Sequence, residues 1–147
     1  MRVVLRTPVS QVPAQVMAGF TRALFVALAP PFPKLRVLRF DGCRTGDKVE
    51  IELDTVVKRL PWTSLIVDDG VRSDGTHFFI DEGRILPPPL RQWRHHHRIE
   101  PGPDGRGSVI VDDLEYRTAS RLLDALLYPA MWAQFAWRQP IYRRWFR

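Results

Sequence analysis

The sequence predicts an α+β fold in which an antiparallel sheet of about six to seven strands packs against a long C-terminal helix. Between residues 34 and 117, apolar and polar side chains alternate with a period of two, which is typical of strands that bury one face. After residue 118 the apolar residues recur every three or four positions, which indicates a helix. Short turns rich in Gly, Pro and Asp separate the strands and favour an antiparallel order.

The N-terminal segment predicts a strand followed by one helix or two, because residues 25–28 either extend the first helix or begin a second short one. Residues 2–8 are rich in Val and Leu, and they predict a short strand. Ser10 can cap the helix that follows, and Pro13 is tolerated in its first turn. Its apolar face has the helical spacing of Val16, Met17, Phe20 and Leu24. The prolines within residues 30–33 then end the helix.

Four strands are predicted next, at residues 35–40, 47–57, 62–72 and 76–85. The alternation is clearest in the second strand, where Val49, Ile51 and Leu53 point inward and the acidic residues between them point outward. The three prolines at 87–89 form a stiff connection to the following hairpin.

Residues 90–116 predict a β-hairpin with an unusual polar cluster on its buried face. On the first strand Trp93, His95, His97 and Ile99 share one face, and the arginines on the other face require solvent. The turn-rich residues 100–107 form the loop. The second strand alternates in the same way, with Ser108, Ile110, Asp112, Leu114 and Tyr116 on the buried face. Symmetric closure of this hairpin would place His95 opposite Asp112.

A long helix is predicted after Thr118, with Ser120 as its cap. Pro129 is expected to kink or divide this helix, and Pro140 is expected to interrupt the tail. The apolar side of the predicted helix consists of Leu122, Leu123, Leu126, Leu127, Ala130, Met131, Gln134 and Phe135.

Length and composition indicate one globular domain, residues 1–147, with 45% hydrophobic and 26% charged residues. The net charge of +6 comes almost entirely from arginine, which a GC-rich genome also produces. Cys43 is the only cysteine, so we expect no disulfide, no cysteine metal site and a cytoplasmic location. We expect no signal peptide and no membrane-spanning segment, and we find no Gly-rich phosphate loop or nucleophile elbow motif.

The order of elements, together with the hairpin pattern, resembles a known superfamily. Trp93-x-His95-x-His97 followed by the alternating run from Ser108 to Tyr116 is similar to the START-like (SRPBCC) superfamily, which includes birch-pollen-allergen-like proteins. The Pro-Phe-Pro stretch at 31–33 and the run from Phe78 to Asp81 resemble a small bacterial branch of it. The resemblance implies the helix-grip fold, in which a curved sheet grips the C-terminal helix. The superfamily mixes carriers with cyclases and hydrolase-like enzymes, so fold alone leaves function open.

The resemblance also implies a cavity between the sheet and the helix. We expect a small, mostly apolar molecule there, such as a lipid, a quinone or a polyketide, with polar side chains orienting its polar end. The residues expected to line this site are Ile51, Leu53, Phe78, Trp93, His95, His97, Ile110, Asp112, Leu114, Tyr116, Leu126, Ala130 and Trp132.

The polar cluster permits two interpretations. His95, Asp112 and Tyr116 could form an acid–base group, in which a carboxylate orients an imidazole and a phenol polarises a carbonyl, as a cyclase or dehydratase requires. Alternatively, they form a buried polar network in which each group satisfies another. The sequence assigns no catalytic residue firmly.

A metal site is a further alternative. His95 and His97 could converge on one ion, with Asp112 or His77 as the third ligand. The pair lacks a clear third and fourth ligand and equally fits a hydrogen-bonded pocket. We therefore expect no metal and no cofactor.

The tail from Trp137 to Arg147 mixes aromatic residues with arginines. Such a segment could contact an anionic membrane surface, because tryptophan favours the interface and arginine attracts the headgroups. Alternatively, its aromatics pack on the sheet while the arginines stay in water. Nucleic-acid binding is not expected, and the sequence leaves the oligomeric state open.

Overall fold

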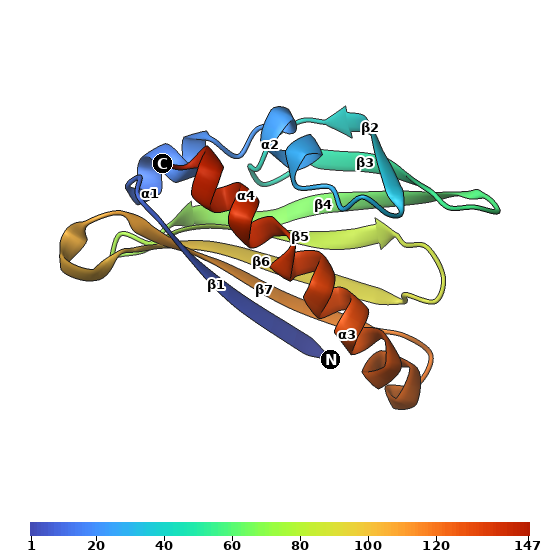
Figure 1. Ribbon diagram of the computed structural model, residues 1–147. Helices are drawn as coiled ribbons and strands as arrows, with labels where there is room; N and C mark the ends of the chain where they lie inside the picture. Colours follow the sequence, from blue (N-terminus) through green and yellow to red (C-terminus); the bar gives the residue numbers. More distant parts are fainter.

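The structure is a computed structural model that describes residues 1–147, and its seven strands form one antiparallel sheet in the order β1-β7-β6-β5-β4-β3-β2 (Figure 1). Only β1 leaves the sequential order, because it pairs with β7 at the end of the chain's meander. The strands are β1 (Arg2–Val9), β2 (Lys34–Phe40), β3 (Lys48–Asp54), β4 (Arg59–Val71), β5 (His77–Ile85), β6 (Gln92–Pro101) and β7 (Ser108–Arg117). The predicted strands are therefore confirmed.

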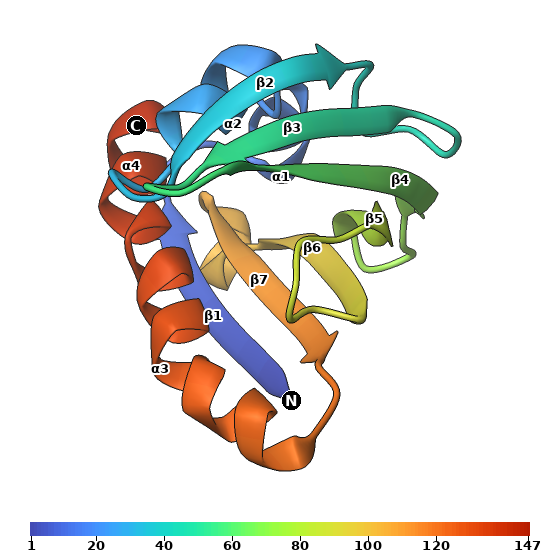
Figure 2. The same cartoon turned by 90° about the vertical axis from the view of Figure 1, so that its right-hand side faces the viewer.

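The sheet curls around the C-terminal helices, which lie along its open side (Figure 2). The helices are α1 (Pro13–Ala18), α2 (Arg22–Ala27), α3 (Arg121–Ala136) and α4 (Arg138–Trp145), with a short 3-10 turn η1 (Pro103–Gly105) in the hairpin loop. None of these helices has both the length and the apolar run needed to cross a membrane.

Of the two alternatives for the N-terminal helical segment, the structure has two short helices. The break falls at Gly19. An added Cβ there would collide with the ring of Phe146, because the C-terminal segment packs against this turn. Ser10 caps neither helix; α2 is capped by Thr21, whose hydroxyl accepts a hydrogen bond from the Leu24 N–H at 3.4 Å. The apolar spacing continues across the break, so the sequence pattern alone did not decide between one helix and two.

Helix α3 begins as predicted, with the Ser120 hydroxyl accepting from the Leu123 N–H at 3.2 Å. Pro129 lies inside α3 without dividing it, and the interruption comes at Trp137. The position of Pro140 explains this break. In a continuous helix residue 140 would donate to a carbonyl four residues earlier, whereas in the first turn of α4 the missing N–H costs nothing.

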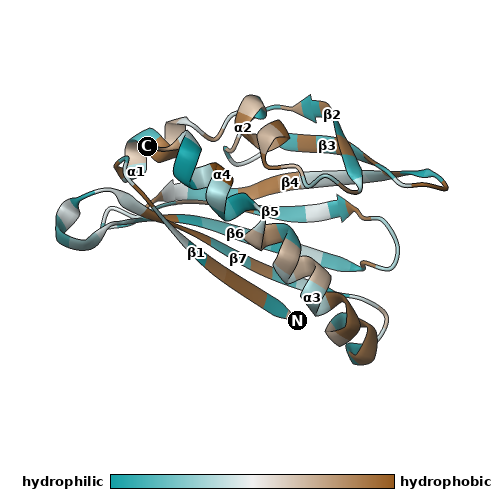
Figure 3. Ribbon diagram, in the orientation of Figure 1, coloured by the Kyte–Doolittle hydropathy of each residue, from teal (hydrophilic) through white to brown (hydrophobic).

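The inward face of α3 corrects the prediction. Leu127, Met131 and Phe135 face the sheet, whereas Leu126 is 68% exposed and Trp132 is 47% exposed. Ala130 is exposed as well. Most residues of α3 are apolar (Figure 3), on its exposed side as well as on its buried side, so the spacing of apolar residues does not identify the buried side.

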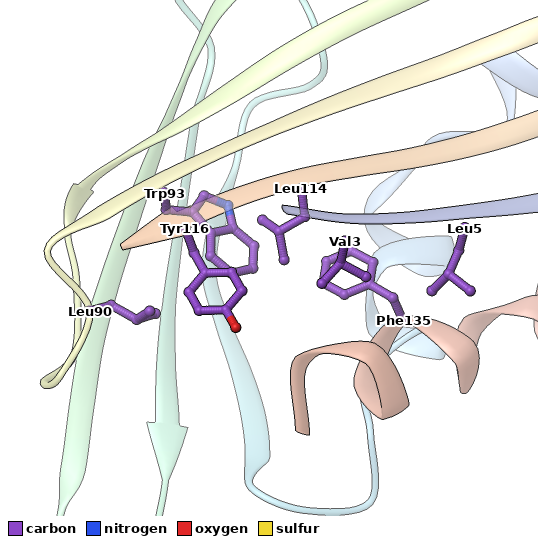
Figure 4. Close-up of a cluster of buried hydrophobic side chains, with 7 residues drawn as sticks. All are labelled: Val3, Leu5, Leu90, Trp93, Leu114, Tyr116 and Phe135. Carbon is purple, nitrogen blue, oxygen red and sulfur yellow. The ribbon is translucent and has the colours of Figure 1, made fainter. Parts of the chain in front are cut away.

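Two hydrophobic clusters pack the helices against the sheet. The first (Figure 4) consists of Val3, Leu5, Leu90, Trp93, Leu114, Tyr116 and Phe135. The second consists of Val16, Leu24, Leu28, Ile99, Ile110, Tyr142 and Phe146. Each cluster packs a C-terminal helix against strands of the sheet: the first packs α3 against β1, β6 and β7, and the second packs α4 against β6 and β7. Both ends of the chain therefore contribute to the core.

Ion pairs fix the outer face of β1, β7 and β6, which is the face predicted to be wet. Arg2 donates to both carboxylate oxygens of Asp113, at 2.8 and 2.7 Å, and Arg98 donates to the same carboxylate at 2.8 Å. These two arginines lower the pKa of Asp113 to about 2, chiefly through the hydrogen bond from Arg2. Such bidentate pairs favour one register of the three strands.

Candidate functional site

A partly open cavity of about 300 Å³ lies between the sheet and the helices α2 and α3. Its walls are mostly apolar, and its rim includes prolines from both the α2–β2 and β5–β6 connections. The apolar walls come from Leu24, Phe25, Leu35, Val49, Ile51, Leu53, Leu60, Phe79, Leu127 and Met131. The charged, imidazole and amide side chains on the wall come from β5, β6 and the junction of α3 with α4: Asp81, His95, His97, Gln134 and Arg138. We call Asp81, His95 and His97 the polar floor.

Strand alternation positions the polar floor. His95 and His97 are two residues apart on β6, and β5 places Phe79 opposite His97 and Asp81 opposite His95. The inward residue of β5 is therefore Phe79 and not Phe78, which corrects the prediction. Three consecutive apolar residues on β5 left its inward face undetermined. The alternation of side chains then places Asp81, two residues after Phe79, on the same inward face.

The hairpin register also differs from symmetric closure. His97 pairs with Asp112, and His95 pairs with Leu114. The strands extend to Pro101 and Ser108, so the loop is shorter than predicted and the pairing shifts by two residues. A shift of two keeps each side chain on the same face. Asp112 and His95 consequently still meet, across a diagonal, with Oδ1 of Asp112 3.1 Å from Nε2 of His95.

Two carboxylates hold the two imidazoles. Oδ2 of Asp81 lies 3.1 Å from Nε2 of His97 and 3.6 Å from Nδ1 of His95. The other oxygen of Asp81 accepts a hydrogen bond from the Trp93 indole N–H at 3.0 Å. Nδ1 of His97 has no hydrogen-bond partner and lies 3.7 Å from Oδ1 of Asp112. Each imidazole thus has a carboxylate within reach of both of its nitrogens.

Aromatic rings enclose the imidazoles. Phe79 stacks on His97 with ring centroids 4.1 Å apart, and the His95 and His97 rings are 3.6 Å apart. Phe135 of α3 meets the His95 ring edge to face at 4.9 Å. These contacts leave the imidazoles few alternative rotamers, because each ring is bounded on more than one side.

Burial sets the protonation of the site. Burial, with the neighbouring charge of His95, lowers the pKa of His97 to about 4, so its ring is neutral at neutral pH. Burial alone would raise the pKa of Asp81, but the hydrogen bond from His97 and the adjacent imidazoles bring it below its usual value. The pKa of Asp112 is lowered in the same way, by its bond to His95 acting against burial. Both carboxylates are therefore ionised at neutral pH.

Tyr116 does not belong to this cluster. Its hydroxyl donates to the backbone carbonyl of Asp124 at 2.7 Å, and its ring is part of the first hydrophobic cluster. The proposed group of His95, Asp112 and Tyr116 is therefore not assembled. The nearby phenol is Tyr142 of α4, which the sequence analysis missed: burial and the charge of Asp112 raise the pKa of Tyr142, and its hydroxyl has no hydrogen-bond partner.

The structure brings some of the predicted lining residues to the cavity and leaves others away from it. Those on its wall are Ile51, Leu53, Trp93, His95 and His97. Asp112 lies behind the polar floor and contacts it through His95. Ile110, Leu114 and Tyr116 are core residues. Phe78, Leu126, Ala130 and Trp132 lie on outward faces, for the reasons given above.

This arrangement has two chemical capacities. Ionised Asp81 on the cavity wall, held by His97 and Trp93, can accept a hydrogen bond or a proton from a polar group in the cavity. The ligand atoms of Asp81, His95 and His97 also lie within 4.8 Å of one another, which is close enough to hold one metal ion. Asp81 takes the place that the sequence analysis gave to Asp112 or His77 as the third ligand.

No protein-family model matches the chain, and no curated protein sequence does either. Solved structures do match. Ara h 8.0201 shares 12% identity with a TM-score of 0.57, and 97% of each chain is covered. The ZhuI aromatase/cyclase from Streptomyces sp. R1128 shares 16% identity with a TM-score of 0.59, over 100% of this chain and 96% of that one.

The di-domain aromatase/cyclase StfQ from the steffimycin biosynthetic pathway shares 13% identity with a TM-score of 0.70. The match covers 99% of this chain and 50% of StfQ, so the chain spans about half the length of that protein. At identities this low, the similarity shows only that the helices and strands are arranged in the same way. The curled seven-stranded antiparallel sheet and the long C-terminal helix agree with it. The chain therefore has the helix-grip fold of the START-like (SRPBCC) proteins.

Proposed function

We propose that the protein binds a small, mostly apolar molecule in the cavity between the sheet and α3, with a polar group of that molecule at the polar floor. The observation that carries the proposal is the cavity itself, of about 300 Å³, with mostly apolar walls and a cluster of carboxylate and imidazole groups. Ligand sites in proteins have this combination and span roughly 300 to 1,000 Å³. A lipid, a quinone or a polyketide-like molecule fits this description.

The two parts of the site have different tasks. The apolar walls supply affinity, at about 25 cal/mol for each Å² of apolar surface removed from water. The polar floor selects ligands, because buried carboxylates and imidazoles left without partners by the wrong ligand cost binding free energy. Met131 on the α3 wall can adapt to different shapes, since its side chain is unbranched and flexible.

The test is native mass spectrometry of the freshly purified protein, followed by solvent extraction and identification of any bound molecule. Leu127→Trp should fill the cavity and abolish binding of that molecule. Leu126→Trp is the matched control, because the same substitution at the neighbouring residue lies on the exposed side of α3. Equal binding by both variants would contradict the proposal, as would failure of a panel of quinones, fatty acids and aromatic polyketides to bind.

A second candidate is acid–base catalysis on such a molecule, for example cyclisation or dehydration. The geometry of Asp81 favours it: an ionised carboxylate on the cavity wall, which His97 at 3.1 Å and the Trp93 N–H at 3.0 Å hold in place to accept a proton. Two of the similar structures are named as aromatase/cyclases, which supports the same direction. With a β-polyketone substrate, His97→Gln should lower kcat by about 100-fold or more. His96→Gln, on the outer face of the same strand, should leave kcat unchanged.

A further inference from the structure

The three side chains of the polar floor are spaced so that they could bind a ligand other than an apolar molecule. Oδ2 of Asp81 is 3.1 Å from Nε2 of His97 and 3.6 Å from Nδ1 of His95. Around a tetrahedral ion with bonds of about 2.0 to 2.1 Å, neighbouring ligand atoms are about 3.3 Å apart. We propose that Asp81, His95 and His97 bind a divalent transition-metal ion such as Zn²⁺, through these three atoms.

The atoms that would not touch the metal are held by partners. Nε2 of His95 is 3.1 Å from Oδ1 of Asp112, and Oδ1 of Asp81 accepts from the Trp93 N–H at 3.0 Å. Metal-binding histidines usually donate their second N–H to a carboxylate, which orients the ring and strengthens the ligand. Asp112 and Trp93 are therefore the outer partners that such a site requires.

The unpartnered nitrogen of His97 fits the same site. A neutral imidazole carries one proton, and a metal at Nε2 would leave that proton on Nδ1. The nearest acceptor for an N–H there is Oδ1 of Asp112, at 3.7 Å. A small movement of either side chain would then give Nδ1 of His97 a hydrogen-bond partner, which it otherwise lacks.

The kind of donor atom indicates which ion would bind. Two nitrogens and one oxygen suit Zn²⁺ or another first-row divalent ion better than Mg²⁺ or Ca²⁺. Because all three ligands line the cavity, the remaining coordination position faces it.

The test uses metal alone, without any apolar ligand, on protein first treated with a chelator. Co²⁺ should bind with one equivalent per chain and give a visible absorption spectrum of a low-coordinate nitrogen and oxygen site, and Zn²⁺ should displace it. Asp81→Asn and His97→Gln should abolish this spectrum. Asp112→Asn should weaken binding by about 10- to 100-fold. His96→Gln should bind like the wild type, since His96 lies on the outer face of β6.

Two results would overturn the metal proposal: no binding of Co²⁺ by the wild type, or the same binding in Asp81→Asn, His97→Gln and the wild type. Should the variants fold poorly, the wild type provides a separate measurement. Zn²⁺ must remove the Nε2 proton signal of His97 from the nitrogen-15 spectrum, and its persistence in the presence of Zn²⁺ would contradict the site. Failure here leaves binding of an apolar molecule untouched, because that test contains no metal.

A different observation concerns the outward side of α3. Between Arg121 and Arg138 the helix has one charged residue, Asp124, and it is buried. The exposed residues along this stretch are Leu122, Ala125, Leu126, Tyr128, Pro129, Ala130, Trp132, Ala133 and Trp137. We call this surface the outer face of α3. Such a continuous exposed apolar surface usually marks an interaction site.

The charge beside this face identifies its partner. Helix α4 continues the course of α3 (Figure 1), so residues three or four apart stay on the same side, and Arg144 follows Trp137 in the stripe that includes Leu126. Arg143 and Arg147 are exposed as well, which makes α4 hydrophilic next to the hydrophobic α3 (Figure 3). We infer that the outer face of α3 lies on an anionic lipid bilayer, with the arginines of α4 at the headgroups.

A second copy of the chain is a poorer partner for this face. The exposed charged residues of α3 and α4 are all arginines, so a symmetric dimer across the helices would bring like charges together. The net charge of +6 adds to that repulsion. Anionic lipids complement the arginines in every orientation. The surface is broader than the tail predicted from the sequence, because it includes most of α3.

Flotation with lipid vesicles tests this inference. The protein should bind vesicles of phosphatidylcholine mixed with phosphatidylglycerol, bind pure phosphatidylcholine more weakly, and lose binding as salt is raised. Leu126→Glu and Trp132→Glu should each reduce binding about tenfold or more. Val56→Glu and Val57→Glu are the controls, since both residues are 90% exposed but lie at the β3–β4 turn. Binding that is unchanged in Leu126→Glu, or a dimer in sedimentation that Leu126→Glu dissociates, would overturn the inference.

Discussion

His97 and Asp112 are directly paired across β6 and β7, but the hydrogen bond of Asp112 goes to His95, one position along the same face. His97 instead bonds Asp81 on β5. The two imidazoles are therefore held from opposite sides by carboxylates of two different strands. Three neighbouring strands must be in register for this arrangement to form, so the polar floor depends on the sheet as a whole.

The lowered pKa of His97 predicts a pH dependence of stability. The unfolded chain binds a proton at His97 below about pH 6.5, whereas the folded chain binds it only near pH 4. Stability should therefore fall as the pH drops from about 6.5 towards 4, with up to about 3 kcal/mol due to this residue. Urea denaturation at a series of pH values measures it. His97→Gln should flatten the decline, and an equally steep decline in this variant would contradict the assignment.

The proton of His97 is predicted to reside on Nε2 in the metal-free protein. Nε2 lies 3.1 Å from ionised Asp81, whereas Nδ1 has no hydrogen-bond partner. An N–H group beside an ionised carboxylate is favoured over a nitrogen lone pair in the same place, so the tautomer with the proton on Nε2 should dominate. Long-range nitrogen-15 spectra distinguish the two forms. An Nδ1–H signal for His97 without metal would mean that the bond to Asp81 is not made.

The sheet could be predicted from the sequence because alternating residues report which face each strand buries. In β3, Val49, Ile51 and Leu53 alternate with acidic residues, so strand and face were both determined. The same argument placed His95 and His97 on the inner face of β6. Local patterns sufficed here because burial acts on every second residue.

Where the buried face could not be predicted, the sequence lacks this alternation of apolar and polar residues. Residues 126 and 127 are both leucines, but Leu126 lies on the exposed side of α3 and Leu127 lines the cavity. Only tertiary packing distinguishes the two positions. Phe78 and Phe79 present the same ambiguity on β5. Asp81 was missed as a partner of His97 because the contact joins two strands, and sequence spacing within one strand contains no information about its neighbour.

Cys43 is predicted to be an unreactive thiol. Burial raises its pKa to about 12, with nearby carboxylates adding to the effect, and its Sγ lies 3.6 Å from the carbonyl oxygen of Phe20. Since only the thiolate is nucleophilic, alkylation near pH 8 should be about a thousand-fold slower than for a free cysteine. Iodoacetamide labelling followed by mass spectrometry measures the rate. Fast labelling of the native protein would show that this wall of the cavity opens readily.

Phe135 should be the residue of α3 that contributes most to stability and to the site together. It is 1% exposed, it meets the ring of His95 at 4.9 Å, and the guanidinium of Arg138 lies over its ring at 4.3 Å. Phe135→Ala should lower the free energy of unfolding by about 3 to 5 kcal/mol. Trp132→Ala, on the outer face of α3, should change it by about 0.5 kcal/mol or less.

Phe135→Leu separates the packing role of this residue from its contact with the imidazole. Leucine keeps much of the buried volume, so the variant should lose less stability than Phe135→Ala does in urea denaturation. It removes the aromatic edge that confines His95, and the imidazole gains freedom to leave the orientation set by Asp112. Binding of Co²⁺ at the polar floor should then weaken in Phe135→Leu beyond what its stability accounts for. Wild-type affinity in this variant would mean that Asp112 alone is sufficient to orient His95.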